Sequence, residues 1–415
     1  MTQTFEVDGN QKFSCRDCPA RCCRMPWGYP VTPSEKERIS ALPWVAARFA
    51  SLGVAFNQLS PERYGLPSIE KNRRLQCAFL DEDNLCSIHK REGVDATPQT
   101  CQTFPLRFIE KEDGTLQTYL SHVCPSIRDN YGEPLAPQLP ERLAKMQGLT
   151  TLKLVPYMSL GLGRIEQKDY LSWADQAAQF LMNSPSPTSA LLQLEEWTSA
   201  IASAVPMDGT HTGDFPNLQE NPFSSVPPAR PSSWAKSTRL LLAFCLAPAS
   251  YPMMSGRPIS RFELLKFCLH KLNFILKIVR QKGSADILFV DRPVPLAEVF
   301  SIHTALSHPD AQRRLGKFLS QLLIRRNFFF SQKSLGEVLF HLALTGALVS
   351  VFARLHAVSQ NRSTCEVQDF VDGESLAELI LTYHGSTIKS HKALRTITEF
   401  MANYPPAFQG LVEAF

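Results

Sequence analysis

The placement of cysteine constrains this chain more than any other feature of its sequence. Of eleven cysteines in 415 residues, eight fall within the first 124 positions. In a chain that stays in a reducing compartment, a thiol cluster of this density predicts a metal centre rather than a set of disulfides. The eight candidate ligands are Cys15, Cys18, Cys22, Cys23, Cys77, Cys86, Cys101 and Cys124.

Charge and hydropathy indicate where such a chain resides. The first twelve residues carry polar and acidic side chains where a secretory signal needs a basic start and an apolar run, so we expect a cytoplasmic protein. The excess of 43 basic over 39 acidic residues is too small for a dedicated nucleic-acid binder. The most apolar stretch, 338–353, is interrupted by His341, and we interpret it as a buried helix rather than a membrane span.

The first block of cysteines has the spacing of a metal site. Two residues separate Cys15 from Cys18, so one tight turn can present both thiolates to the same metal or cluster. Cys22 and Cys23 are adjacent, and adjacent side chains diverge. We therefore expect these two to serve different metals or different roles.

The other four clustered cysteines lie in turn-rich contexts. The acidic turn 81–84 is expected to bring Cys77 and Cys86 together, and Cys101 and Cys124 lie close to prolines. Proline beside a ligating cysteine recurs in iron-sulfur proteins, where it stiffens the turn. Eight thiols suit two four-ligand sites or one four-iron cluster with thiols to spare, and the spacing accepts iron-sulfur and zinc equally. The remaining cysteines are interpreted as small buried hydrophobic residues: Cys245, Cys268 and Cys365.

Periodicity predicts a mainly α protein that follows an irregular, cysteine-rich module. Within the module, 1–135, Thr32 can cap a short helix from Pro33, and a small hairpin should pair Leu106–Glu110 with Leu116–Val123. A helical segment, 136–205, and a helical domain, 232–415, flank a proline-rich linker or long loop at 206–231. The expected helices lie near 140–148, 168–182, 187–204, 234–246, 258–282, 309–330, 333–357, 374–384 and 387–403.

Three of these blocks together resemble a known family. They are Phe13-Ser-Cys15-Arg-Asp-Cys18-Pro-Ala-Arg-Cys22-Cys23, then Cys77-Ala-Phe-Leu with Cys86-Ser-Ile-His89, then Cys101-Gln-Thr-Phe-Pro105. The combination is similar to the YkgJ-like family of zinc- or iron-chelating cysteine-cluster proteins. That family includes the flagellin lysine N-methylases, the FliB-like branch, whose members share a cysteine-proline that matches Cys124-Pro125.

The resemblance implies a four-iron, four-sulfur cluster, S-adenosylmethionine as methyl donor and a protein substrate that bears lysine. The chain's one candidate for a glycine-rich donor loop, Gly161-Leu-Gly163, lacks a third glycine and is interpreted as a turn. The donor would then bind in another way, with its amino and carboxylate groups on an iron that no fourth thiolate caps. The rival hypothesis is a non-catalytic zinc- or iron-chelating module with a structural or metal-handling role. The sequence leaves the oligomeric state open.

Overall fold

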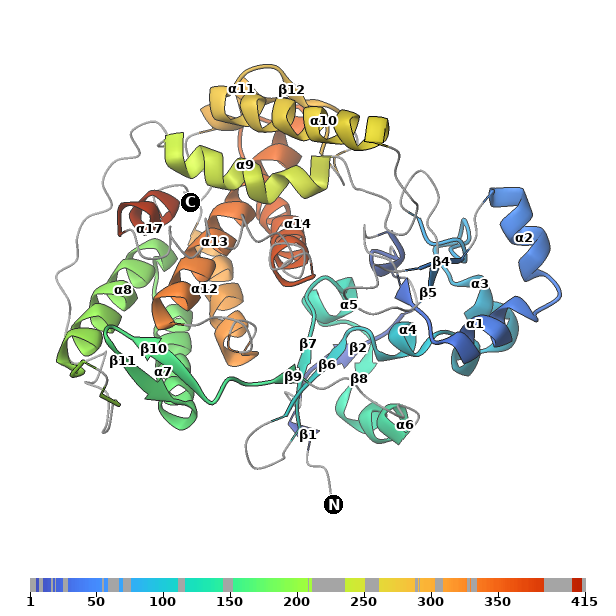
Figure 1. Ribbon diagram of the computed structural model, residues 1–415, viewed down its shortest axis with the longest axis horizontal. Coiled ribbons are helices and arrows are strands. Elements are labelled where there is room, and N and C mark those ends of the chain that lie inside the picture. The colour runs from blue at the N-terminus through green and yellow to red at the C-terminus, as the bar shows by residue number, and fades with distance from the viewer. Residues whose placement is uncertain are drawn as a thin grey trace. The chain divides into compact units, whose positions relative to one another are not determined.

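The computed structural model confirms a mainly α protein (Figure 1). Contacts between Cα atoms divide the chain into two compact units, 1–152 with 252–266 and 153–251 with 267–415. The structure describes residues 5–6, 10–15, 18, 20–24, 29–53, 56–58, 67–69, 76–110, 116–144, 152–207, 209–210, 236–250, 261–287, 290, 292–302, 309–326, 329, 334–383 and 405–412.

The first unit contains short elements and all eight clustered cysteines. Its helices are brief, and its longest strands form one hairpin. Its elements are β1 (Phe5–Glu6), β2 (Lys12–Phe13), η1 (Cys22–Arg24), β3 (Tyr29–Pro30), α1 (Pro33–Ser40), α2 (Val45–Leu52), β4 (Phe56–Gln58), β5 (Pro67–Ile69), α3 (Ser87–Glu92), η2 (Val94–Ala96), α4 (Gln99–Thr103), β6 (Leu106–Glu110), β7 (Leu116–Leu120), α5 (Pro125–Arg128), β8 (Glu133–Pro134), η3 (Ala136–Gln138), α6 (Leu139–Ala144) and β9 (Leu152–Lys153).

The predicted hairpin is confirmed, because β6 and β7 pair antiparallel from Leu106 opposite Leu120 to Glu110 opposite Leu116. The residues that join the two strands, 111–115, lie outside the described residues. The hairpin belongs to a larger sheet in the order β1-β7-β6-β9, in which β1 runs parallel to β7. The sheet therefore includes β1 and β9, two-residue strands that are too short to be predicted from a sequence pattern.

The second unit is built from longer helices and two antiparallel strand pairs, β10 with β11 and β12 with β13. The predicted helices near 168, 187, 234, 258, 309 and 333 are all confirmed within a few residues, whereas the one at 387–403 lies outside the described residues. Its elements are β10 (Tyr157–Leu160), β11 (Gly163–Glu166), α7 (Gln167–Asn183), α8 (Pro187–Ala204), α9 (Lys236–Ser250), α10 (Arg261–Arg280, whose first turns belong to the first unit), β12 (Ser284–Ala285), β13 (Val294–Pro295), α11 (Leu296–Ser301), α12 (Pro309–Ile324), α13 (Leu335–Ser359), α14 (Val367–Glu378), the π-helical turn η4 (Leu379–Tyr383) and α17 (Pro405–Val412).

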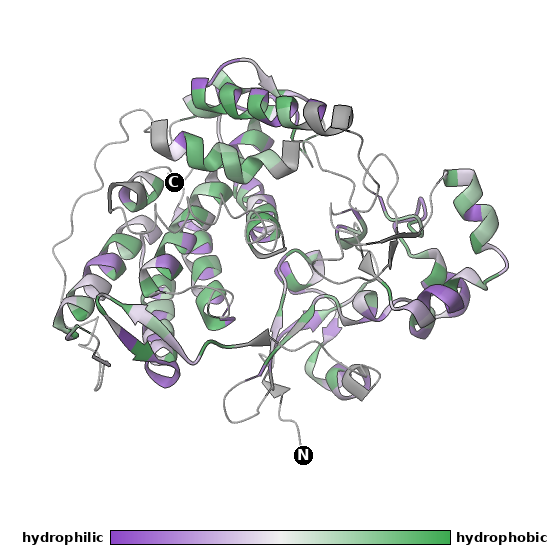
Figure 2. Ribbon diagram, viewed as in Figure 1, coloured by the Kyte–Doolittle hydropathy of each residue, from purple (hydrophilic) through white to green (hydrophobic). Residues whose placement is uncertain are grey.

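Helix α13 forms the centre of this unit and packs against α8, α12, α14 and α17. Hydrophobic residues run along most of its length (Figure 2). Within the described part of the chain, α13 alone is long and apolar enough to cross a membrane, yet 94% of its apolar window is buried in the protein. The interpretation of 338–353 as a buried helix is therefore confirmed.

Gly161 and Gly163 lie in the hairpin of β10 and β11, where Leu160 pairs with Gly163 across a two-residue turn. Gly161 has a φ of +60°, and a Cβ there would lie 2.7 Å from the carbonyl oxygen of Ala202. The two glycines therefore serve a tight turn and close packing. Most of the predicted linker 206–231 lies outside the described residues.

Helix α14 begins at Val367, seven residues before the start that periodicity predicts, so the expected boundary at 374 is wrong. Its first turn is fixed by the buried carboxylate of Asp369, which accepts hydrogen bonds from both guanidinium nitrogens of Arg362 at 2.6 and 2.7 Å. His356 Nδ1 lies 2.5 Å from the same group. Burial by itself would raise the pKa of Asp369, but the contacts with His356 and Arg362 outweigh burial and hold it at about 2.

Replacing Asp369 with Asn should destabilise the helical unit, because His356 and Arg362 lose their ionic partner at a fully buried position. We expect a loss of about 3 kcal/mol in the free energy of unfolding, measured by urea at neutral pH. Asp372→Asn on the same helix, whose carboxylate accepts one hydrogen bond of 3.5 Å from Gln368, is the matched control.

The pH dependence of this difference follows from the lowered pKa of Asp369. The carboxylate contributes its full stabilisation above the ordinary value of 3.8 and loses it as the pH falls towards about 2. The stabilities of the wild type and Asp369→Asn should therefore converge over that interval. A constant difference across the interval would show that ionised Asp369 is not the stabilising group.

Candidate metal centre

The adjacent cysteines lie in the short turn η1, where the amide of Arg24 donates to the carbonyl oxygen of Arg21 at 3.0 Å. The two sulfur atoms, Cys22 Sγ and Cys23 Sγ, are 3.8 Å apart, which is van der Waals contact, so the expectation that these adjacent side chains diverge is wrong. This pair is the point at which two wider groups of thiols meet.

The first group surrounds Cys22. Apart from Cys23, the neighbouring thiols that influence the pKa of Cys22 are those of Cys124, Cys18 and Cys15, and each raises it. Cys18 and Cys15 also raise the pKa of Cys124. Cys15 is exposed and Cys124 is buried. We name Cys15, Cys18, Cys22 and Cys124 the first thiol group.

Hydrogen bonds between distant segments assemble the first thiol group. The amide of Ser14 donates to Ser126 Oγ at 2.7 Å, and that hydroxyl donates to the carbonyl oxygen of Tyr131 at 2.8 Å. The residue before Cys15 is therefore tied to the turn that follows Cys124-Pro125. Tyr131 also faces the group, since burial and then the neighbouring thiols of Cys18 and Cys124 raise the pKa of its hydroxyl.

The second group surrounds Cys101 on α4. The neighbouring thiols that raise the pKa of Cys101 are those of Cys77, Cys23 and Cys86. The amide of Cys77 donates to the carbonyl oxygen of Cys23 at 2.8 Å, and Leu80 forms a β-bridge with Cys86. We name Cys23, Cys77, Cys86 and Cys101 the second thiol group.

Glu35 positions the helix that carries Cys101. Thr32 caps α1 as predicted, since its Oγ1 accepts from the amide of Glu35 at 3.2 Å. Glu35 Oε2 completes a capping box by accepting from the amide of Thr32 at 2.7 Å. The other carboxylate oxygen, Oε1, accepts from the amide of Gln99 at 2.6 Å. One side chain therefore joins the first turns of α1 and α4.

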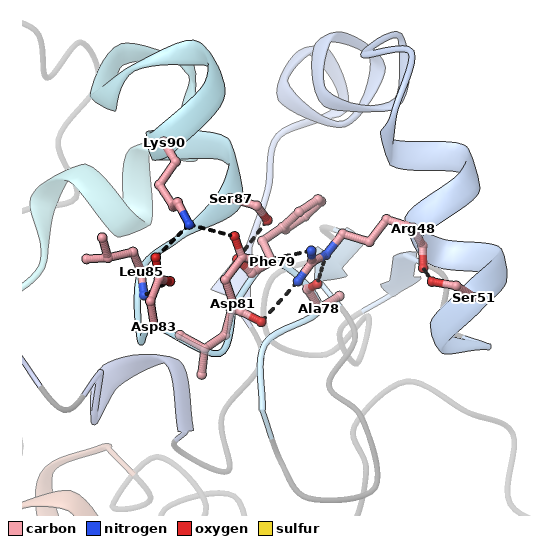
Figure 3. A network of polar contacts seen from close by, with 10 residues as sticks. Arg48, Ser51, Ala78, Phe79, Asp81, Asp83, Leu85, Ser87 and Lys90 are labelled. Carbon is pink, nitrogen blue, oxygen red and sulfur yellow. Dashed lines mark hydrogen bonds and ion pairs between the residues drawn. The ribbon is translucent and has the colours of Figure 1, made fainter.

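The loop between Cys77 and Cys86 is held by two cations (Figure 3). Arg48 on α2 donates to the carbonyl oxygens of Ala78 and Leu80 at 2.5 and 3.0 Å, and to Asp81 at 2.8 Å. Lys90 on α3 contacts Asp83 at 2.6 Å. The acidic turn that the sequence marks as the closure of this loop is thus fixed from both sides.

Burial keeps these thiols protonated in the absence of metal. Burial raises the pKa of Cys124 to about 12, and it raises the pKa of Cys101 well above the ordinary value of 9.0. The pKa of Cys86 is raised for the same reason. For Cys22, contact with Cys23 lowers the pKa, but burial and the other thiols raise it more. A metal that binds here must displace protons, so its affinity falls as the pH falls.

The arrangement fits a thiolate-bound centre in donor chemistry, but it does not form a closed shell around one ion. A tetrahedral zinc with Zn–S bonds of about 2.3 Å brings its sulfurs to roughly 3.8 Å from one another. In the described ranges, which include all eight cysteines, no group of three or more His, Cys, Asp or Glu side chains converges in this way. Thiolate donors of this kind suit an iron-sulfur cluster as well as zinc, so the donor chemistry does not choose between the two.

The other cysteines divide by exposure. Cys245 is buried on α9, where burial raises its pKa to about 12, as expected for a small hydrophobic residue. Cys365 is partly buried, and Cys268 is exposed on α10, so the interpretation of Cys268 as a buried residue is wrong.

Sequence reasoning missed three residues that position the thiols: Arg48, Lys90 and Tyr131. Each of them contacts a residue outside its own helix or turn, so no local sequence pattern could have predicted the contact. The one local signal was the acidic turn 81–84, which requires neighbouring cations if it is to be held in place.

Comparison with known proteins gives partial matches. No family model matches the chain, and no solved structure matches it. The chain is 27% identical over 154 residues to a lysine-N-methylase of Salmonella typhimurium, and 28% identical over 153 residues to one of Salmonella choleraesuis. Each match covers 35% of this chain and 36% of the relative, so it spans about a third of the relative's length.

A third relative is the flagellar biosynthetic protein FliU of Salmonella muenchen. It is 28% identical over 123 residues, which are 28% of this chain and 68% of that protein. The class of protein defined by fold and site is therefore a mainly α protein with a thiol-rich N-terminal unit, similar in part to lysine-N-methylases.

Arg48→Ala should loosen the loop that carries Cys77 and Cys86, because three hydrogen bonds are lost and the carbonyl oxygen of Ala78 is left without this donor. We expect a loss of about 1–3 kcal/mol in unfolding free energy. Alkylation of Cys77 and Cys86 in metal-free protein should become faster. Ser51→Ala, on the same helix but exposed, is the control, and equal alkylation rates in both variants would contradict the positioning role.

Proposed function

We propose that the chain is a protein-lysine N-methyltransferase that uses S-adenosylmethionine and whose N-terminal thiols bind an iron-sulfur cluster in the cytoplasm. The observation that carries the proposal is the similarity to two lysine-N-methylases in a chain that gathers eight cysteines into two groups. The similarity to a flagellar biosynthetic protein supports flagellin as the protein substrate. Because the matches cover about a third of the two lysine-N-methylases, the activity of the whole chain is inferred from a part.

The proposed reaction is a methyl transfer between a sulfonium and an amine. A lysine side chain has a pKa of about 10.4, so its nitrogen must lose a proton before it can attack. The nitrogen then forms a bond to the methyl carbon while the bond from that carbon to the donor sulfur breaks, which leaves methyllysine, a thioether and one released proton. An iron-sulfur cluster, when bound, supplies redox and Lewis-acid chemistry.

The chain's own residues account for the binding part of this proposal. In the second thiol group, Arg48 and Glu35 fix the segments that carry the cysteines, and in the first group Ser126 does so through Ser14. Thiolate ligands favour iron-sulfur clusters and zinc over hard cations such as magnesium. The choice of a cluster over zinc follows from the family resemblance of the cysteine blocks, since both centres accept four thiolates.

A second candidate is a structural metal module without catalysis. It is favoured by the short elements of the first unit, whose two small cores each include cysteines. A unit of this kind gains folding free energy from a metal. Both candidates require metal, and only the methyltransferase requires a methyl donor.

Metal and acid-labile sulfide content of anaerobically purified protein tests the cofactor. We expect brown protein with about four irons and four sulfides for each cluster, whereas zinc without sulfide would contradict the iron-sulfur proposal. Cys245→Ser should leave the metal content unchanged, since Cys245 is buried on α9 in the other unit.

Incubation of the loaded protein with S-adenosylmethionine and flagellin tests the activity. Mass spectrometry should detect methyl groups on flagellin lysines, and the donor should bind to the loaded protein in the absence of substrate. If loaded protein neither binds the donor nor methylates flagellin, the enzyme proposal fails and the structural module is favoured.

A further inference from the structure

We propose that the eight thiols form two separate four-thiolate centres, Cys15, Cys18, Cys22 and Cys124 in one, and Cys23, Cys77, Cys86 and Cys101 in the other. The inference rests on the proposed metal binding and not on the methyl transfer. It divides the adjacent pair, so that Cys22 belongs to one centre and Cys23 to the other.

Hydrophobic packing separates the two thiol groups. Cys124 belongs to a core that contains Phe13, Leu106 and Phe108. Cys23, Cys77 and Cys86 belong to another core, with Val31, Ile39, Val45, Phe79 and Ile88. Cys124 of the first group and three cysteines of the second are thus attached to different cores, and the two cores share no residue.

Hydrogen bonds between distant segments separate the groups in the same way. The bond from Ser14 to Ser126 assembles the first group from the two ends of the cysteine-rich region. The bond from Cys77 to Cys23, together with the bond from Gln99 to Glu35, assembles the second group from the segments between them. The two sets of contacts use different residues.

The backbone at Cys22 and Cys23 connects the two groups. Both residues lie in one tight turn. Cys23 packs against the core that contains Cys77 and accepts a hydrogen bond from the amide of Cys77, whereas the thiols of Cys124, Cys18 and Cys15 are the ones that raise the pKa of Cys22. This turn therefore supplies one ligand to each centre. Two-cluster ferredoxins use the same principle, in which one run of cysteines provides a ligand to the neighbouring cluster. The contact of 3.8 Å between the sulfurs makes the two centres immediate neighbours.

Double variants distinguish two centres from one. Cys18→Ser and Cys86→Ser should each lose about half of the bound metal. The double variant Cys18→Ser/Cys22→Ser, with both changes in one group, should again lose about half, whereas Cys18→Ser/Cys23→Ser should lose nearly all. If the first double variant loses as much as the second, or if either single variant loses all metal, the two-centre proposal is overturned.

Thiol mapping on the wild type provides a readout that does not depend on variants that fold. The loaded protein is treated stepwise with a chelator, alkylated rapidly and analysed by tandem mass spectrometry, which resolves Cys22 from Cys23. We expect Cys22 to become reactive together with Cys15, Cys18 and Cys124, and Cys23 together with Cys77, Cys86 and Cys101. Joint reactivity of Cys22 and Cys23, or labelling of any of the eight before chelation, would overturn the assignment.

These outcomes are independent of the proposed function. Two zinc centres with the predicted thiol sets would support the division and refute the iron-sulfur proposal. Two iron-sulfur centres in a protein that does not methylate flagellin would support the division and refute the enzyme. A single cluster in an active methyltransferase would support the enzyme and refute the division into two centres.

Discussion

The hydrogen bond of 2.8 Å from the amide of Cys77 to the carbonyl oxygen of Cys23 is the contact on which the first unit depends most. It joins the turn that holds both adjacent cysteines to the loop that Arg48 and Lys90 fix. Without it, Cys23 would lie at the end of a segment with few regular elements. The same hydrogen bond also helps to place Cys23 near Cys101 on α4, since Cys23 is one of the thiols that raise the pKa of Cys101.

The two units bury polar groups in different ways. The helical unit compensates buried carboxylates with cations inside the protein, as in the pairs Arg314–Glu374 at 2.9 Å and Arg362–Asp369 at 2.6 Å. The first unit buries thiols, which are neutral when protonated and need no such partner. If metal replaces those protons, two closed four-thiolate centres would leave donor and lysine binding to other residues of the chain.

Local signals in the sequence predicted the elements that depend on local contacts. The Thr32 capping box, the pairing of β6 with β7, and the long helices α7, α8 and α13 follow from caps, turns and periodicity. The start of α14 was placed at 374, just after Gly373, although this glycine lies inside the helix and permits close packing: a Cβ there would lie 2.6 Å from the carbonyl oxygen of Val349. The sequence allowed two four-thiol sites but did not predict which thiols lie together, because that depends on contacts such as Ser14 with Ser126 between segments far apart in sequence.

Glu35 shows how a single position can couple two parts of such a unit. Its two carboxylate oxygens accept from Thr32 and from Gln99, so it takes part at once in the start of α1 and in the placement of the helix that carries Cys101. Serine could replace Thr32 as a cap, and many residues could supply the amide at position 99. The acidic side chain at 35 has no such substitute, because glutamine offers one acceptor oxygen where two are used. Tolerance to sequence change should therefore be lowest at a residue that is neither a thiol nor part of either hydrophobic core.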